Sequence, residues 1–297
     1  MPRLEHLYLV DQTIFEQPFP LNNTSAEELP SVPLPHLATL RLFGTTYDCT
    51  TLVSHITPSS FVDLEIDCTG IETVPEIQVL MDFVKDNFAR SCVIDNSPPL
   101  SVRMKVSANQ LAIDVDMVLP NVEQKRLVSL GIDSRAAEFF KSRVSTVCPI
   151  VFDSIPAAAA KRLEILSKFS ISADAWAYVL NRMTQVRVLN ASFAGAVNLS
   201  HVLGSCTGTT PSFVAQQLKS LKFSGVSFTY KTSQQRHFRE ALLECLQKRS
   251  NEGQRIKNLN FHSCSDFGVT VVPQFKKVAD NVCWDRESED DTILFDD

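Results

Sequence analysis

This chain is poor in the residues on which most nucleotide and hydrolase sites depend. Its 297 residues include 9 glycines, and these never form Gly-x-Gly-x-x-Gly or Gly-x-x-x-x-Gly-Lys, so the loops that hold phosphate groups are missing. It has no Gly-x-Ser-x-Gly motif and no cysteine in a recognised nucleophile context, which argues against Ser-His-Asp and thiol enzymes. We therefore expect no catalytic residue and no cofactor.

Metal-binding patterns are also scarce. The 8 cysteines form no Cys-x-x-Cys pair and no histidine stands at ligand spacing from them, so buried thiols in a reducing compartment are expected instead. Asp63, Glu65 and Asp67 alternate along one segment, and Asp114 and Asp116 along another, which leaves a metal or acid–base role open. Alternation on a strand places such carboxylates in water, however, and we expect no metal site.

Long apolar stretches are absent. The longest, such as residues 147–152, are far too short to span a bilayer, and the N-terminal residues do not form the apolar region of a signal peptide. We therefore expect no membrane partner and a cytoplasmic or nuclear location.

Net charge is confined to one end of the sequence. Residues 285–297 contain 7 acidic and 1 basic residues, a net of −6, and the whole chain is also −6, so residues 1–284 are electrically balanced. A balanced body argues against nucleic-acid binding. We expect residues 285–297 to be a disordered acidic tail, with a functional interaction tail as the alternative.

One phrase, Leu-x-x-Leu-x-Leu with conservative replacements, recurs along the chain. Its copies are Leu4-x-x-Leu7-x-Leu9, Leu37-x-x-Leu40-x-Leu42, Phe61-x-x-Leu64-x-Ile66, Leu218-x-x-Leu221-x-Phe223 and Ile256-x-x-Leu259-x-Phe261, with a weaker one at Met183-x-x-Val186-x-Val188. Cys264 follows the Ile256 copy where a leucine-rich repeat places Asn or Cys. The phrase predicts parallel strands at residues 37–43, 61–67, 218–224 and 256–262, with their leucines buried.

Helices are predicted between these strands. Apolar residues at helical spacing favour helices over residues 77–88 and 174–183, the second opened by Ser172. A third is expected to be capped by Ser233 and closed by Lys248 and Arg249. In the middle, residues 102–106 and 111–115 alternate as strands and predict a hairpin, with Asn109 suited to a positive φ in its turn.

Several of these segments resemble the leucine-rich repeats of fungal, mushroom-type F-box proteins. The resemblance is carried by residues 1–9, 34–42 and 51–56, by Leu243-x-x-Leu246-x-x-Arg249 with the phrase at 256–264, and by Val282-Cys283-Trp284-Asp285. It implies the substrate-receptor region of a ubiquitin ligase subunit. In that family an F-box grips a Skp-type adaptor. Because no F-box-like run precedes Leu4, adaptor binding is expected only if an upstream F-box exists.

The expected fold is an irregular α/β leucine-rich-repeat solenoid over residues 1–284, curved, with an inner parallel sheet and outer helices and loops. The residues between the buried leucines should form a concave, protein-binding face. These candidates are His6, Tyr8, Thr39, Arg41, Phe43, Asp63, Glu65, Asp67, Ser220, Lys222, Ser224, Asn258, Asn260 and His262. A freestanding interaction scaffold with no ligase link, and an enzyme on an irregular α/β fold, are the alternatives.

Overall fold

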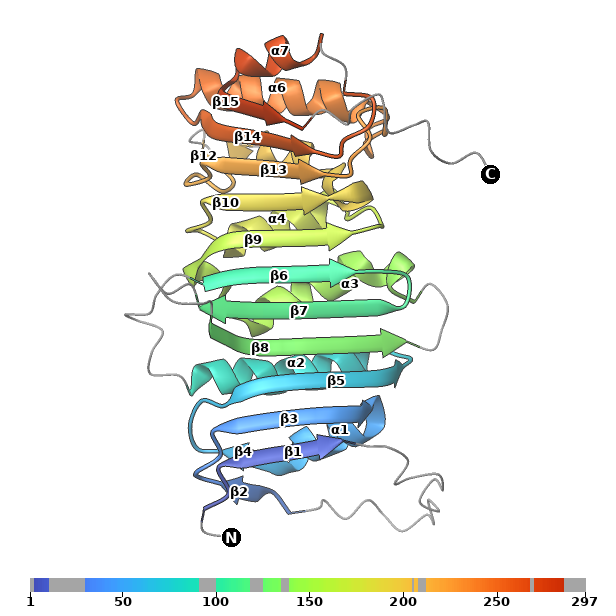
Figure 1. The fold of residues 1–297 in the computed structure, drawn as a ribbon, viewed down its shortest axis with the longest axis vertical. Coiled ribbons are helices and arrows are strands. Elements are labelled where there is room, and N and C mark those ends of the chain that lie inside the picture. Colours follow the sequence, from blue (N-terminus) through green and yellow to red (C-terminus); the bar gives the residue numbers. More distant parts are fainter. Residues whose placement is uncertain are drawn as a thin grey trace. The chain divides into compact units, whose positions relative to one another are not determined.

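A computed structural model describes residues 3–10, 30–90, 100–117, 125–134, 139–204, 206–207, 212–267 and 270–285. The chain divides into two compact units, Met1–Pro156 (unit 1) and Ala157–Asp297 (unit 2). Each combines helices with a mainly parallel sheet (Figure 1), which confirms the α/β class. The single solenoid over residues 1–284 stays a prediction, and residues 286–297 of the expected tail lie outside the described residues.

Unit 1 is built on a sheet with the strand order β1-β3-β5-β8-β7-β6. Its elements are β1 (His6–Val10), β2 (Val32–Leu34), β3 (Thr39–Thr45), α1 (Thr46–His55), β4 (Ile56–Pro58), β5 (Asp63–Ile71), α2 (Val74–Ala89), β6 (Leu100–Val106), β7 (Gln110–Met117), β8 (Lys125–Ser134) and α3 (Phe139–Ser154). Strands β1, β3, β5 and β8 run parallel, whereas β7 is antiparallel to both β6 and β8. A separate parallel pair joins β2 and β4.

The predicted hairpin is confirmed as β6 and β7, and β8 extends it to three antiparallel neighbours. The Ser107 N–H donates to the Gln110 carbonyl at 2.8 Å and closes the turn. Asn109, a residue type able to take a positive φ, does not have one in this turn. Asp116, expected in water, is buried where the register of β7 against β8 shifts.

Unit 2 is built on an all-parallel sheet with the order β9-β10-β13-β14-β15. Its elements are the 3-10 helix η2 (Ala157–Ala159), β9 (Ala160–Ser167), α4 (Ala173–Arg182), β10 (Val188–Ser192), the 3-10 helix η3 (Phe193–Ala196), α5 (Leu199–Leu203), β11 (Cys206–Thr207), β12 (Ser212–Phe213), β13 (Ser220–Ser224), α6 (Phe238–Asn251), β14 (Ile256–His262), α7 (Val272–Lys276) and β15 (Ala279–Trp284). Strands β11 and β12 form a small antiparallel pair.

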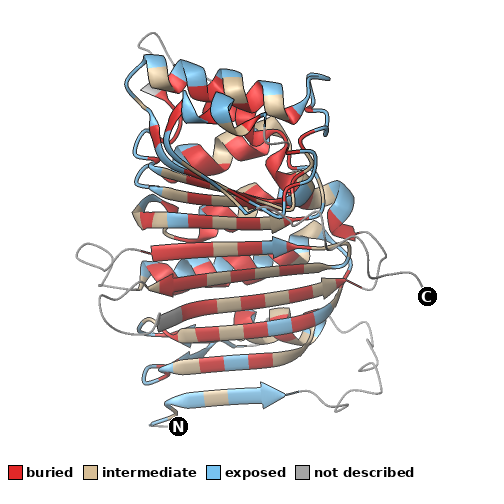
Figure 2. Cartoon of the chain, turned by 45° about the horizontal axis from the view of Figure 1, so that its top comes forward, coloured by how far each residue is buried: buried red, intermediate tan, exposed pale blue. Residues whose placement is uncertain are grey.

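The four predicted phrase strands are confirmed as β3, β5, β13 and β14. In unit 1 Leu40 aligns with Leu64 and Leu42 with Ile66, and in unit 2 Leu221 aligns with Leu259 and Phe223 with Phe261. All eight side chains are buried. Figure 2 shows the resulting alternation of buried and exposed residues along the strands.

The weaker copy was placed in the wrong frame. Val188 aligns with Ser220 on the non-core side of the sheet, whereas Leu189 aligns with Leu221. The repeat in β10 is therefore Val186-x-x-Leu189-x-Ala191. It does not match the phrase clearly, because alanine stands where a large apolar residue is expected.

Local signals explain where the helices begin. Helix α2 starts at a capping box made by Thr73 and Glu76, and Ser172 caps α4 as predicted, its hydroxyl accepting the Ala175 N–H at 3.2 Å. The prediction of a Ser233 cap is wrong. Gln235 has a φ of +62° and its N–H donates back to Thr232 at 2.9 Å, so the chain turns there and α6 begins only after His237.

The core of unit 2 is aromatic at the β13–β15 end. Phe261 stacks on Phe223 with ring centroids 5.9 Å apart, and Phe275 lies 5.0 Å from Phe261. Trp284 packs edge-on against Phe267 at 5.2 Å. Cys264 is buried, as predicted, and its thiol lies 3.4 Å from the His262 carbonyl, although β14 is followed by a further strand, β15.

Candidate functional site

The helices of each unit lie on one face of its sheet, behind the strands in the view of Figure 1. The opposite face of each sheet, which carries none of the described helices and on which the binding residues were predicted to lie, is called here the outer face. Every predicted candidate lies on an outer face and is exposed or half-exposed. Unit 1 carries His6, Tyr8, Thr39, Arg41, Phe43, Asp63, Glu65 and Asp67. Unit 2 carries Ser220, Lys222, Ser224, Asn258, Asn260 and His262.

Strand register arranges the outer face of unit 1 into rows that cross the strands. One row contains Tyr8, Arg41, Glu65, Ser129, Asp114 and Arg103. The next contains Val10, Phe43, Asp67, Gly131, Ala112 and Lys105. Side chains in such a row are direct neighbours, because adjacent strands lie only about 4.8 Å apart.

Arg41 joins two strands on this face. Its guanidinium lies 5.2 Å from the centre of the Tyr8 ring, and its Nε lies 3.1 Å from Oε2 of Glu65. Tyr8 remains more than half exposed. Tyrosine and arginine are among the residue types that most often dominate the binding energy at protein interfaces. Tyr8 and Arg41 are therefore the strongest candidates on this face for contact with a partner.

A second feature of this face is the pair of carboxylates at Asp67 and Asp133. Gly131 makes room for Asp67, since a Cβ at Gly131 would lie 2.8 Å from the Asp67 Oδ1 atom. Burial raises the pKa of the Asp133 carboxyl above its usual range, the negative charge of Asp67 raises it further, and a hydrogen bond with Gln110 partly opposes both. A positive group brought by a partner would relieve this repulsion.

The outer face of unit 2 is more neutral and rich in amides. One row contains Arg162, Val188, Ser220, Asn258 and Asn281. The next contains Glu164, Asn190, Lys222, Asn260 and Cys283. The Asn281 amide donates to Asn258 Oδ1 at 3.2 Å. At the end of β14, Nδ1 of His262 lies against the carboxylate of Asp285, which also accepts the Ser263 N–H at 3.1 Å.

Three strands of unit 2, β10, β13 and β14, are each followed by a residue in the left-handed region. Ser192, Ser224 and His262 align with one another across the strands. The residues that follow them are Phe193, Gly225 and Ser263, with φ values of 56°, 61° and 48°. The Phe193 ring rests on Gly225, because a Cβ there would lie 2.7 Å from Cε1 of Phe193. A partly exposed aromatic ring is thus fixed at the edge of the outer face.

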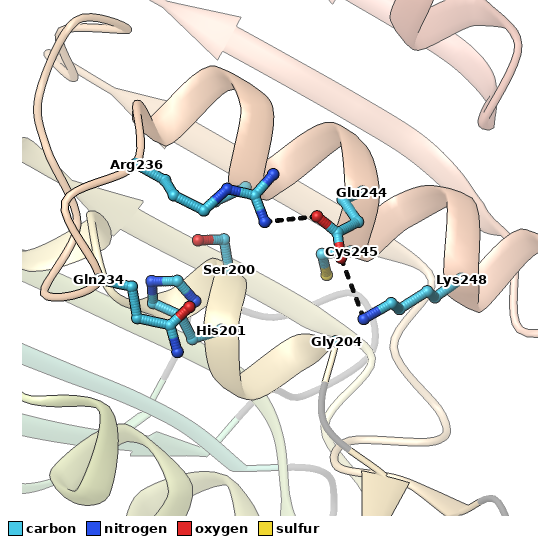
Figure 3. A pocket seen from close by; sticks show the side chains of 9 residues that line it. Ser200, His201, Gly204, Gln234, Arg236, Glu244, Cys245 and Lys248 are labelled. Atoms are coloured by element: carbon cyan, nitrogen blue, oxygen red, sulfur yellow. Dashed lines mark hydrogen bonds and ion pairs between the residues drawn. The ribbon is translucent and has the colours of Figure 1, made fainter.

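On the helical side of unit 2 there is a pocket of about 190 Å³ between α5, the 231–237 turn and α6 (Figure 3). Arg236 and Lys248 each bind one oxygen of Glu244, at 2.5 and 3.2 Å. These hydrogen bonds hold the pKa of Glu244 below its usual range. Burial raises the pKa of the Cys245 thiol to about 12. Neither group is therefore prepared as a nucleophile or a general acid.

Comparison with protein-family models, with curated proteins and with solved structures finds no match. Within the described ranges, no three His, Cys, Asp or Glu side chains gather as a metal site requires. The helices of that part of the chain all fall short of the length and apolar character needed to cross a membrane.

Sequence reasoning missed the outer-face residues on strands without a clear phrase. Ser129 and Asp133 lie on β8, and Arg162 and Glu164 lie on β9, two strands that carry no clear copy of the phrase. Register with β10 gives the hidden copy on β9 as Ala160-x-x-Leu163-x-Ile165, in which alanine takes the first leucine position.

Proposed function

We propose that this chain is a protein-recognition scaffold of the leucine-rich-repeat type, whose outer sheet faces bind a protein partner. The observation that carries the proposal is the set of in-register rows on the outer faces. Each row presents side chains from four or more neighbouring strands at fixed spacing. Rigid strands hold such groups more accurately than loops do, which favours recognition of a large, structured surface.

The chemistry of the rows favours a protein over other ligands. The row through Arg41 alternates basic, acidic and hydroxyl groups, and the row through Lys222 places amides on either side of a single cation. Mixed charges and amides match the polar rim and hydrogen bonds of protein interfaces. A nucleic acid would instead call for an excess of basic residues, and residues 1–284 have none.

The ligase role is the more specific part of the proposal and rests on resemblance to the repeats of mushroom-type F-box proteins. It is supported by the alignment of the phrase copies within each unit, as expected for stacked repeats. In this role the chain would select substrates in the cytoplasm or nucleus. A Skp-type adaptor would join only through an upstream F-box.

The binding face can be tested with charge reversals in the full chain. One variant combines Arg41→Glu with Lys222→Glu on the outer faces. Its matched control combines Lys85→Glu with Lys276→Glu, on the exposed sides of α2 and α7. Proteins recovered from cell extract by wild type and control should be depleted about tenfold or more by the outer-face variant, because charge reversal at an interface costs over 1 kcal/mol. Equal recovery by all three proteins would contradict the proposal.

The freestanding scaffold is separated from the ligase subunit by the adaptor. If the gene product translated with its upstream sequence co-purifies with a purified Skp-type adaptor, the ligase role gains direct support. If the partner set is lost with the outer-face variant but no adaptor co-purifies, the chain is an interaction scaffold without a ligase link.

A further inference from the structure

Among the described residues, strand β1 ends the sheet of unit 1, and none of them covers its free edge with another strand. In the described part of the chain β3 is its only strand partner, and their five residue pairs follow one another without a bulge. The sequence His6-Leu7-Tyr8-Leu9-Val10 contains neither proline nor lysine nor a carboxylate. Natural edge strands normally carry such residues, because an open edge is a template for another strand.

The apolar side chains Leu9 and Val10 of β1 are more exposed than their equivalents one strand further in. Leu9 aligns with Leu42, yet Leu9 is 44% exposed and Leu42 only 2%. Tyr8 and Val10, on the outer face, are 53% and 57% exposed. In Figure 2, β1, the strand next to the N label, is almost entirely exposed. Apolar side chains on both faces of this strand therefore still have surface to bury.

The main chain of β1 also has hydrogen-bonding groups directed away from the sheet. The Glu5 carbonyl accepts the Ala38 and Thr39 N–H groups at 2.8 and 3.1 Å and so faces β3. Peptide groups of alternate residues point to opposite edges of a strand, so those of Leu7 and Leu9 also face β3. Those of His6, Tyr8 and Val10 point outward.

We propose that unit 1 pairs with a second copy of this chain through β1, as an antiparallel strand pair centred on Tyr8. A two-fold axis at this point places Tyr8 opposite Tyr8 of the second copy and His6 opposite its Val10. These are the residues whose N–H and C=O groups point outward, so each pair exchanges two hydrogen bonds as an antiparallel ladder requires. The symmetry therefore satisfies the main chain without any shift of register.

The side chains are self-complementary in the same register. Leu7 lies opposite Leu9 of the second copy on the helix-covered side, so the half-buried Leu7 of each copy covers the exposed Leu9 of the other. On the outer face the two Tyr8 rings form a cross-strand aromatic pair. Each ring is backed by Arg41 of its own copy. Within His6–Val10 no two charges of like sign face each other, because His6 lies opposite Val10.

The assembly state of the full chain tests this pairing. Because the contact is small, its dissociation constant should fall in the range of about 1–100 µM. Sedimentation equilibrium should show a mass that doubles from 33.1 kDa as concentration rises through this range. Val10→Lys should weaken the dimer at least tenfold, whereas Val79→Lys, the same change at an exposed site on α2, should not. A strict monomer, or a dimer insensitive to Val10→Lys, would overturn the proposal.

Two further variants test the strand pairing independently, in case Val10→Lys perturbs folding. Of the main-chain groups, Tyr8→Pro removes only an N–H that points outward, a change that an edge strand tolerates. It also removes the ring that lies beside Arg41, and it should abolish pairing. In a Cys283→Ser background, Tyr8→Cys should form an intermolecular disulfide under mild oxidation, since directly paired residues have Cα atoms about 5.5 Å apart. Arg41→Cys, one strand further in, should not. A monomer whose β1 amides resist hydrogen exchange would show another segment on this edge and refute the pairing.

Discussion

Arg249 is a buried cation that is held by main-chain carbonyls. It was expected to close α6 against the helix dipole, but its side chain is fully buried. Its guanidinium donates to the carbonyls of Leu203, Val214 and Ala215 at 3.3, 3.0 and 3.1 Å. Burial lowers the pKa of this arginine, yet the three acceptors join α6 to α5 and to the turn after β12. Arg249 therefore links three segments of unit 2 through hydrogen bonds.

Replacing Arg249 by methionine should lower the free energy of unfolding of unit 2 by about 3 kcal/mol. The volume is nearly kept, but three buried carbonyls lose their donors, each at a cost of roughly 1 kcal/mol. Lys248→Met is the matched control. Lys248 is the adjacent residue and forms an exposed ion pair with Glu244, so its loss should cost under about 0.5 kcal/mol. Urea unfolding of both variants measures the difference. Similar unfolding midpoints for the two variants would show that the hydrogen bonds of Arg249 do not stabilise unit 2.

Asn87 shows at residue scale what a sequence pattern cannot reveal. It lies on the buried side of α2, where its amide accepts from the Val62 N–H at 2.9 Å and donates to the Val62 carbonyl at 2.8 Å. The helical stripe of apolar residues predicted α2, but nothing in the sequence around Asn87 indicates a partner 25 residues away. Such pairs depend on tertiary structure, so a single sequence without known contacts leaves them out.

At the scale of elements, the sequence predicted what local pattern determines. The strands with full phrases, the hairpin of β6 and β7, and helices α2 and α4 were found because hydrophobic period and capping are local signals. Strands β9 and β15 were missed as repeats, because Ala160 and Ala279 stand where the phrase expects leucine. Only the pairing of β9 and β15 with neighbouring strands shows which of their residues occupy the repeat positions. The candidate face predicted from sequence therefore lacked the outer-face residues of these two strands.

Gly225, in the left-handed turn after β13, can be compared with Gly253, which follows α6. Gly225 and Gly253 both have positive φ, +61° and +73°. An added Cβ at Gly225 meets the Phe193 ring, whereas at Gly253 it meets nothing within 4 Å. Gly253→Ala should therefore cost about 1 kcal/mol for the backbone alone, and Gly225→Ala about 2–3 kcal/mol.

Thermal unfolding of the two variants measures this difference. Phe193→Ala added to Gly225→Ala removes the collision and should return the cost of the alanine to about 1 kcal/mol, which a double-mutant cycle would record. If Gly225→Ala and Gly253→Ala destabilise equally, the contact of Phe193 with Gly225 has no energetic weight.

For the whole molecule, acid should act early on unit 2 through His201. Burial lowers the pKa of His201, the nearby charge of Arg236 lowers it further, and Glu244 partly opposes them. The unfolded chain takes up a proton at this histidine near its ordinary pKa of about 6.5, whereas the folded chain does so only at lower pH. In between, the unfolded state binds more protons. The free energy of unfolding should therefore fall as pH is lowered from about 6.5 through the folded pKa.

The chain's tryptophans make this effect measurable in one unit. The sequence has 2 tryptophans, Trp176 and Trp284, and both belong to unit 2, so their fluorescence follows its unfolding. Urea titrations between about pH 7 and 5 should give a steeper loss of stability for wild type than for His201→Asn, whose side chain cannot take up a proton. His36→Asn, an exposed site in unit 1, should leave the wild-type slope unchanged. Equal slopes for wild type and His201→Asn would assign the acid sensitivity to carboxylates such as Glu244, whose pKa is lowered by Arg236 and Lys248 and whose contribution is lost only at more acidic pH.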